Sequence, residues 1–162
     1  MAHGNEAEDI ADGIADLVRK PTERKVTIAL IDPNGPCIPE LASYLDIPQA
    51  ELVRRIQSSL GNLHEAWSKL GSDERDRLTI KVYRTIPIAS VIILDGNRPE
   101  GRIQIDIKPY RVARNYSFSF ELAGPGHTLY DLCNKAWGSL VAEAADFVPQ
   151  IIAKEPTETP SS

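Results

Sequence analysis

The sequence predicts a single α/β domain, a sandwich in which a mixed β-sheet of about five strands is flanked by helices. Two observations lead to this fold class. The 162 residues, with a mass of 17.9 kDa, are enough to bury one core without disulfides or metal. Segments of helical periodicity first alternate with strand-like segments, and several strand-like segments then follow one another, which is typical of a parallel pair joined to antiparallel hairpins.

Three segments have apolar residues at every third or fourth position, the spacing of an amphipathic helix. They are residues 6–19, residues 47–70 and a last helix that Thr128 can cap. Asp46 is the expected N-cap of the second helix. The first helix is expected to bury Ile10, Ile14, Leu17 and Val18, and the last to bury Leu129, Leu132, Ala136, Leu140 and Ala144.

Five segments have the character of strands. Residues 26–31 are almost all apolar, which indicates a strand of a parallel sheet that is buried on both faces. Residues 96–100 are typical of a hairpin connection. The other expected strands are residues 78–83, 88–94, 103–107 and 118–122.

Composition and charge limit the classes of function. We expect disordered ends at residues 1–5 and 151–162 around a domain of residues 6–150. The net charge of -5 and a pI near 5.2 disfavour generic nucleic-acid binding. No apolar run is long enough to span a membrane. The two cysteines do not have the spacing of a zinc site. The sequence therefore predicts a cytoplasmic protein without a metal or other cofactor.

The loop after the first strand is a candidate ligand site, because ligands of α/β folds bind beyond the carboxyl ends of strands. Asp32 and Asn34 can hydrogen-bond a ligand there, and Cys37 is a possible nucleophile. The alternative is a Pro/Gly turn with a passive thiol. The absence of an activating group near Cys37 in the sequence favours this alternative for the cysteine.

The densest basic and aromatic stretch of the chain follows the fourth expected strand. Arginine suits bidentate contact with phosphate or carboxylate, and tyrosine can stack on a base. The alternative is a solvated loop. We expect an anionic small molecule or nucleotide to be contacted by Arg84, Lys108, Tyr110, Arg111 and Arg114.

Residues 78–95 combine one expected strand with Ile88, Ser90 and Asp95 on the next. This segment resembles part of a phospholipase D-like domain, in which a strand leads into a His-x-Lys-(x)4-Asp motif on the following strand. Ile88 takes the His position and Ser90 the Lys position, so only Asp95 matches. The order of elements over roughly residues 6–147 is similar as well, most of all to small, motif-poor bacterial members of the family.

The resemblance implies a domain that lacks the phosphohistidine chemistry of the active family, because isoleucine cannot act as a nucleophile. It implies a regulatory or sensor module for an anionic small molecule, a nucleotide or a protein partner. It also implies a homodimer, since the family builds its sites from two half-motifs. Two alternatives stay open. One is a phosphodiester-acting hydrolase that uses Asp32, Asp95 or Cys37, and the other is a dimeric scaffold or accessory subunit with a large exposed apolar patch.

Overall fold

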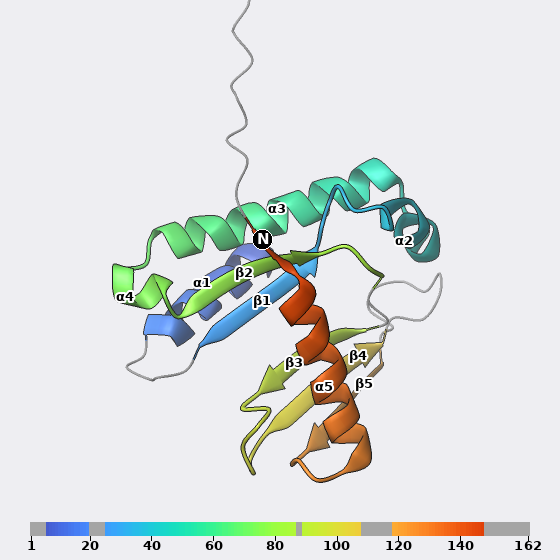
Figure 1. Ribbon diagram of the computed structural model, residues 1–162. Helices are drawn as coiled ribbons and strands as arrows, with labels where there is room; N and C mark the ends of the chain where they lie inside the picture. The colour runs from blue at the N-terminus through green and yellow to red at the C-terminus, as the bar shows by residue number, and fades with distance from the viewer. Residues whose placement is uncertain (1–5, 20–24, 87–88, 108–117, 148–162) are drawn as a thin grey trace, which may run out of the picture.

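The computed structural model describes residues 6–19, 25–86, 89–107 and 118–147, and within these ranges the side chains from residue 12 onward. The fold is mixed α/β, as the sequence predicts (Figure 1). The helices are α1 (Glu6–Arg19), α2 (Ile38–Leu45), α3 (Gln49–Ser68), α4 (Ser72–Arg75) and α5 (Thr128–Glu143). The strands are β1 (Val26–Ile31), β2 (Leu78–Tyr83), β3 (Ser90–Leu94), β4 (Arg102–Ile107), β5 (Phe118–Ala123) and β6 (Ala145–Asp146).

The strands form two three-stranded sheets, and the prediction of a single sheet of about five strands was wrong. One sheet has the order β1-β2-β6 and the other β3-β4-β5. β3 runs opposite to β1 and β2 and pairs with β4, its hairpin partner, so the residue 96–100 connection is confirmed (Figure 1). Alternating apolar residues identify a strand, but they do not say which strand it pairs with.

The first sheet contains the parallel pair that the sequence predicts. β1 and β2 run side by side from Val26 opposite Leu78 to Ile31 opposite Tyr83. The backbone N–H of Asp32 extends the ladder by donating to the Tyr83 carbonyl at 2.7 Å. β1 is an edge strand of this sheet and its Thr27 is exposed, so the expected burial of β1 on both faces is only partial.

Three helices, rather than the predicted one, connect β1 to β2. α3 corresponds to the expected long helix, whereas the short α2 and α4 were missed. Asp46 does not cap α3 as expected. It ends α2 in the left-handed conformation, with φ of 55°, and its N–H donates to carbonyls of the last turn. Pro48 takes the N-cap position of α3 because proline has no N–H to leave unpaired.

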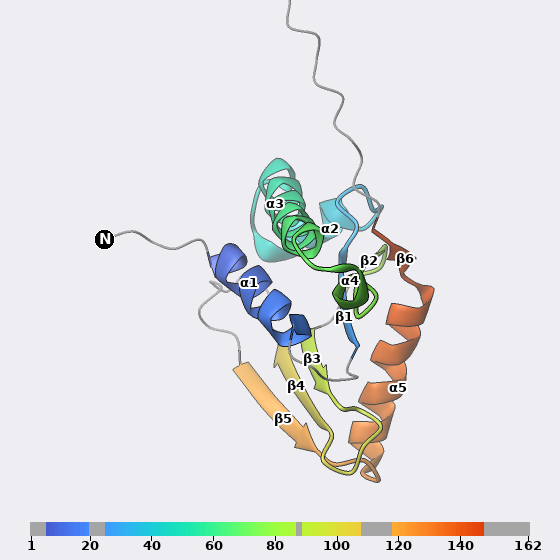
Figure 2. The same ribbon diagram turned by 90° about the vertical axis from the view of Figure 1, so that its left-hand side faces the viewer.

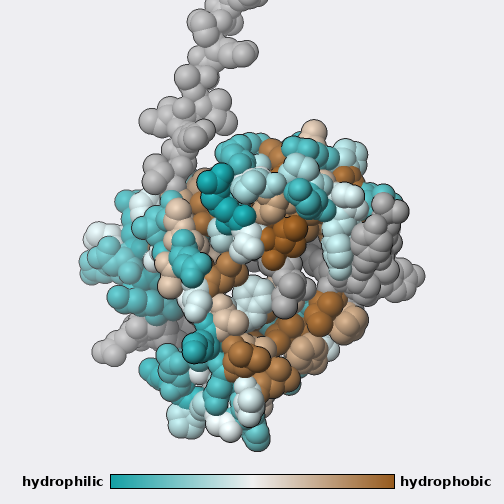
Figure 3. Space-filling view, turned by 45° about the vertical axis from the view of Figure 1, so that its right-hand side comes forward, coloured by the Kyte–Doolittle hydropathy of each residue, from teal (hydrophilic) through white to brown (hydrophobic). Residues whose placement is uncertain are grey.

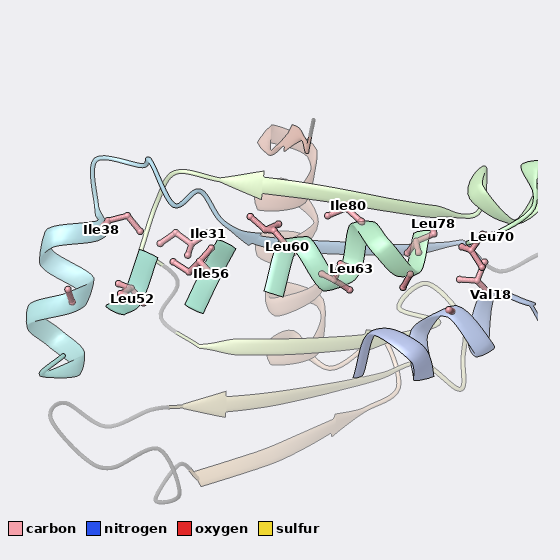
Figure 4. Packing of buried hydrophobic residues seen from close by; sticks show 13 residues of the cluster. Val18, Ile31, Ile38, Leu52, Ile56, Leu60, Leu63, Leu70, Leu78 and Ile80 are labelled. Atoms are coloured by element: carbon pink, nitrogen blue, oxygen red, sulfur yellow. The ribbon is translucent and has the colours of Figure 1, made fainter. Parts of the chain in front are cut away.

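The larger core lies between α1, α2, α3 and the first sheet (Figure 4). The predicted stripe of α3 supplies much of it, and Leu60 is 2% exposed. α1 matches its predicted bounds and contributes Ala15 and Val18. Leu17 is 42% exposed, contrary to prediction, because only the Ala15–Val18 side of the helix joins the core.

The second, smaller core lies between α5 and the sheet β3-β4-β5. Ile103 and Ile105 of β4 and Tyr130 of α5 are its buried residues among those described. Tyr130 is 1% exposed, and its hydroxyl donates to the Gly96 carbonyl at 3.0 Å. This bond anchors the start of α5 to the hairpin between β3 and β4.

The predicted buried stripe of α5 was largely wrong. Leu129 is 52% exposed, Leu132 is 61% exposed and Ala136 is exposed, although Ala144 is buried as expected. The helix turns its Tyr130 side to the sheet because the tyrosine ring fills the core and its hydroxyl finds an acceptor. The apolar arc of α5 is therefore wider than the part that the sheet covers.

The end of α5 joins the two sheets. After α5 the chain forms β6, which pairs with β2 of the first sheet, and the Phe147 N–H donates to the Ile80 carbonyl at 2.9 Å. Lys81 Nζ donates to the Ala144 carbonyl at 3.1 Å. α5 thus packs on one sheet and delivers a strand to the other, as Figure 2 shows from the side.

Candidate functional site

The parallel pair brings Asp32 and Arg84 together, as expected for residues that directly follow two neighbouring parallel strands. Arg84 Nε lies 3.4 Å from Asp32 Oδ2. The Arg84 side chain is 67% exposed and that of Asp32 is 21% exposed. The carboxylate therefore orients the guanidinium from one side and leaves its other face open to solvent.

The loop after β1 is held in place by its own backbone. The Asn34 N–H donates to Asp32 Oδ1 at 2.8 Å, and the Gly35 N–H donates to the Asp32 carbonyl at 2.9 Å. Gly35 is buried, and a Cβ at this position would lie 3.0 Å from the Asp32 carbonyl oxygen. Glycine thus allows the loop to fold tightly against the strand end. The turn that the sequence suggested is present, and it presents Asp32 to Arg84.

Cys37 closes the loop as the N-cap residue of α2. Its Sγ lies 3.4 Å from the Arg84 carbonyl oxygen, with the thiol as donor. This bond joins the start of α2 to the backbone that follows β2, and the geometry favours a structural role of Cys37 over that of a nucleophile. The bond also ties the loop to the backbone of Arg84.

Tyr83 is a residue of this site that the sequence reasoning missed. Burial, and in second place the nearby Cys37, raise the pKa of Tyr83 to about 12. Its phenol is therefore neutral throughout the physiological range. The signal in the sequence was its place as the last residue of β2, immediately before Arg84.

The residues of the degenerate motif fall into different places. Ser90 is exposed at the start of β3, opposite Asp106 of β4. Asp95 follows β3 with a φ of 48°, and its Oδ1 lies 3.9 Å from Arg98 Nε. Because β3 runs opposite to β1 and β2, Asp95 lies at the end of the molecule away from Arg84 (Figure 1). Ile88 lies outside the described residues.

The predicted basic and aromatic contacts at Lys108, Tyr110, Arg111 and Arg114 also lie outside the described residues. The residues next to this segment are described. β4 ends and β5 begins at the same end of the molecule where β1 and β2 end (Figure 1). Ile107 and Phe118, the described residues on either side of the segment, therefore belong to strand ends on the same side of the fold as the end of β2.

Other candidate sites are less developed. A hollow of about 440 Å³ is lined by Pro39, Glu40, Ser43 and Tyr44, all from the outer side of α2. One helix supplies every lining residue, so the hollow has no opposite wall to enclose a ligand. The described part of the chain holds no group of three or more His, Cys, Asp or Glu side chains arranged for a metal ion.

None of the described helices is both long and apolar enough to cross a bilayer. Comparison of the chain with family models, curated proteins and solved structures gave no match. The likeness to phospholipase D-like domains thus rests on the sequence pattern alone and stays a prediction.

Proposed function

We propose that this chain is a non-catalytic binding module that holds an anionic ligand, a phosphate or carboxylate group, at the carboxyl ends of β1 and β2. One observation carries the proposal: Arg84 is an exposed guanidinium that Asp32 orients where two parallel strands end. Ligands of α/β folds bind in this position. A guanidinium held from one side can offer its free donors to two oxygens of a phosphate or carboxylate.

The setting of Arg84 supports an anion rather than a cation. α2 begins beside the same loop, and the N-terminus of a helix carries a partial positive charge. β4 ends and β5 begins at this end of the fold, and Lys108, Arg111 and Arg114 lie between these strands in the sequence. We therefore propose that cations of this segment join Arg84 around the ligand, as the sequence predicts.

The positions of the other polar groups support binding without turnover. Ser90 and Ile88 stand where the resembled family has Lys and His, and Asp95 lies away from Arg84. The Cys37 thiol is engaged with a backbone carbonyl. The resemblance and the exposed Arg84 guanidinium are the support for proposing a regulatory module that senses an anion. A protein carrying an acidic or phosphorylated group is a ligand of the same chemistry.

The test is isothermal titration calorimetry of the full chain with inorganic phosphate, ATP and citrate, each as a separate ligand. Arg84→Gln should weaken binding at least about tenfold, since a charge-assisted bidentate contact is lost. The matched control is Arg98→Gln. Arg98 is 60% exposed and pairs with the carboxylate of Asp95 in the connection between β3 and β4, away from the ends of β1 and β2. If the two substitutions weaken binding equally, or if none of the three probes binds, the proposed anion site at Arg84 is wrong.

The same protein tests the hydrolase alternative. Incubation with bis(4-nitrophenyl) phosphate should release no nitrophenol above the buffer rate. Turnover by the purified chain that Asp95→Ala abolishes would replace the non-catalytic proposal with the hydrolase.

A further inference from the structure

One flank of α5 is apolar and uncovered. Leu129 and Leu132 are 52% and 61% exposed, and Ala136, one turn further on, is exposed on the same flank. The opposite flank is engaged, since Asn134 Nδ2 donates to the Gly96 carbonyl at 3.2 Å and to Asn97 Oδ1 at 3.1 Å. These bonds turn the Asn134 side of the helix toward the β3–β4 hairpin. The leucine flank therefore turns toward β5.

β5 is an edge strand whose aromatic side chains lie on the same side of the sheet as α5. Phe118 and Phe120 pair with Ile107 and Ile105 of β4, so they share the sheet face that Ile105 presents to the α5 core. They are nevertheless 56% and 40% exposed. Among the strands that the structure describes, only β4 pairs with β5.

The helix flank and the strand form one apolar surface, which we call the α5–β5 face: Phe118, Phe120, Leu129, Leu132 and Ala136. Figure 3 shows hydrophobic side chains gathered over the lower part of the molecule, where α5 and the second sheet lie. A fully exposed aromatic side chain presents about 200 Å², so these exposures leave on the order of 400 Å² of apolar surface in contact with water.

This area matches one half of a symmetric dimer interface. A standard interface covers about 800 Å² on each partner, and somewhat over half of that is apolar. The edge itself carries no lysine or proline between Phe118 and Ala123, the residues that commonly prevent edge-to-edge pairing.

We propose that the α5–β5 face binds a second copy of this chain, with β5 pairing antiparallel to β5 of the partner subunit. A two-fold axis at Phe120 places Phe120 opposite itself and Phe118 opposite Leu122, which gives one aromatic cross-strand pair between two Phe–Leu pairs on the α5 side. On the other side of the sheet, the same register places Glu121 opposite Ser119 rather than opposite another carboxylate. Arg102 of the same chain pairs with Glu121 and neutralises it.

The other edge of the sheet offers no comparable surface. Ile92 and Leu94 of β3 are 52% and 55% exposed, but they lie on the sheet face away from α5. α5, which carries the exposed leucine flank, packs on the opposite face. A substitution in β3 can therefore serve as the control for a substitution in β5.

The experiment measures the mass of the full chain by sedimentation equilibrium between about 1 and 100 µM. We expect a reversible dimer in the wild type and a dissociation constant raised at least about tenfold in Phe120→Arg, because a charge would face its own copy. Ile92→Arg should leave the dimer unchanged. Circular dichroism with equal melting temperatures shows that both variants are folded.

A second variant tests the register. Phe120→Cys should form an intermolecular disulfide between the two copies of residue 120 on mild oxidation, since opposed residues of antiparallel strands have Cα atoms about 5 Å apart. Peptide mapping by mass spectrometry identifies the bond, and Ile92→Cys should not form one.

A monomer at the highest concentration, a dimer that Ile92→Arg weakens as much as Phe120→Arg does, or the absence of the linked peptide would overturn the proposal. The first outcome would favour a foreign strand or another part of this chain as the occupant. The interface does not involve Arg84, so Arg84→Gln should dimerise normally. The experiments therefore test the dimer and the anion site independently of each other.

Discussion

Tyr83 and Arg84 are neighbours in sequence but have opposite surroundings. Tyr83 is the last residue of β2 and is partly buried beside Cys37, whereas the Arg84 guanidinium is exposed beside Asp32. This alternation is the ordinary geometry of a strand, in which successive side chains point to opposite sides. It gives the strand end one side chain that packs and one that is free to bind.

The raised pKa of Tyr83 predicts a loss of stability at alkaline pH. A folded-state pKa of about 12 above the usual value of 10 means that the folded chain holds the phenol proton more tightly. This contribution is complete below pH 10 and is lost as the pH rises through 12. We expect about 1–2 kcal/mol after allowance for solvent screening.

Urea denaturation at several pH values between 9 and 12 measures this loss. Tyr83→Phe removes the titrating group. The free energy of unfolding of the wild type should therefore fall relative to that of the variant as the pH rises over that interval. A difference that does not change with pH would contradict the assignment.

Gly101 lies so close to Tyr130 and Asp95 that the second core has no room for a side chain at this position. A methyl group at this position would overlap Tyr130 Oη and lie 2.6 Å from the Asp95 carbonyl oxygen. Gly101→Ala should therefore displace Tyr130 from its bond to Gly96 and lower the free energy of unfolding by about 2–4 kcal/mol. Chemical denaturation checks this. A variant as stable as the wild type would show that the hairpin is looser than the structure indicates.

At the scale of elements, α3 is the helix whose role is most complete. It has buried residues along one face and places them between α1 and the first sheet. Near its start Glu51 accepts hydrogen bonds from Arg54 and Arg55, and these bonds lower the pKa of Glu51. The carboxylate thus supports the first turn above the usual carboxyl pKa, and this support is lost as the pH falls through the lowered value.

Two neighbouring positions of α3 should respond in opposite directions. Gly61 is exposed, and a Cβ there would meet nothing within 4 Å, so Gly61→Ala should raise the free energy of unfolding by about 0.5–1 kcal/mol. Leu60→Ala should lower it by about 2–5 kcal/mol because Leu60 is fully packed. Urea denaturation of both variants measures the contrast, and equal signs would contradict the orientation of α3.

At the scale of the whole molecule, the two sheets have cores of very different size. Among the described residues, thirteen buried side chains form the core around the first sheet and three form the core around the second. α5 is the element that joins them, because it packs on the second sheet and its end continues into β6 of the first.

The unequal cores predict unequal protection from hydrogen exchange. Amides of β2 and α3 should exchange most slowly, and those of β3, β4 and β5 should exchange faster by local opening. Hydrogen–deuterium exchange with mass spectrometry measures this order. Dimerisation through the α5–β5 face should slow exchange in β5 as the protein concentration rises, and uniform protection of both sheets in a dilute sample would contradict the two-core description.

The sequence by itself determined the elements with strong local patterns. α1, α3, α5 and five of the six strands lie close to their predicted bounds, because periodicity and breaking residues act within a few positions of each other. It also named Asp32 and Arg84 as ligand contacts. Their proximity follows from the parallel pairing of β1 and β2, because each residue directly follows one of these strands. The short α2 and the two-residue β6 were missed because so few residues show no clear period.

Only the tertiary structure decided how these elements combine. The division into two sheets depends on which strand edges meet, and no local pattern records that choice. The buried side of α5 was likewise undetermined, because the helix is apolar over an arc wider than one sheet can cover. Tyr130 settled it by filling the second core and bonding to Gly96, and this packing left Leu129 and Leu132 on the surface.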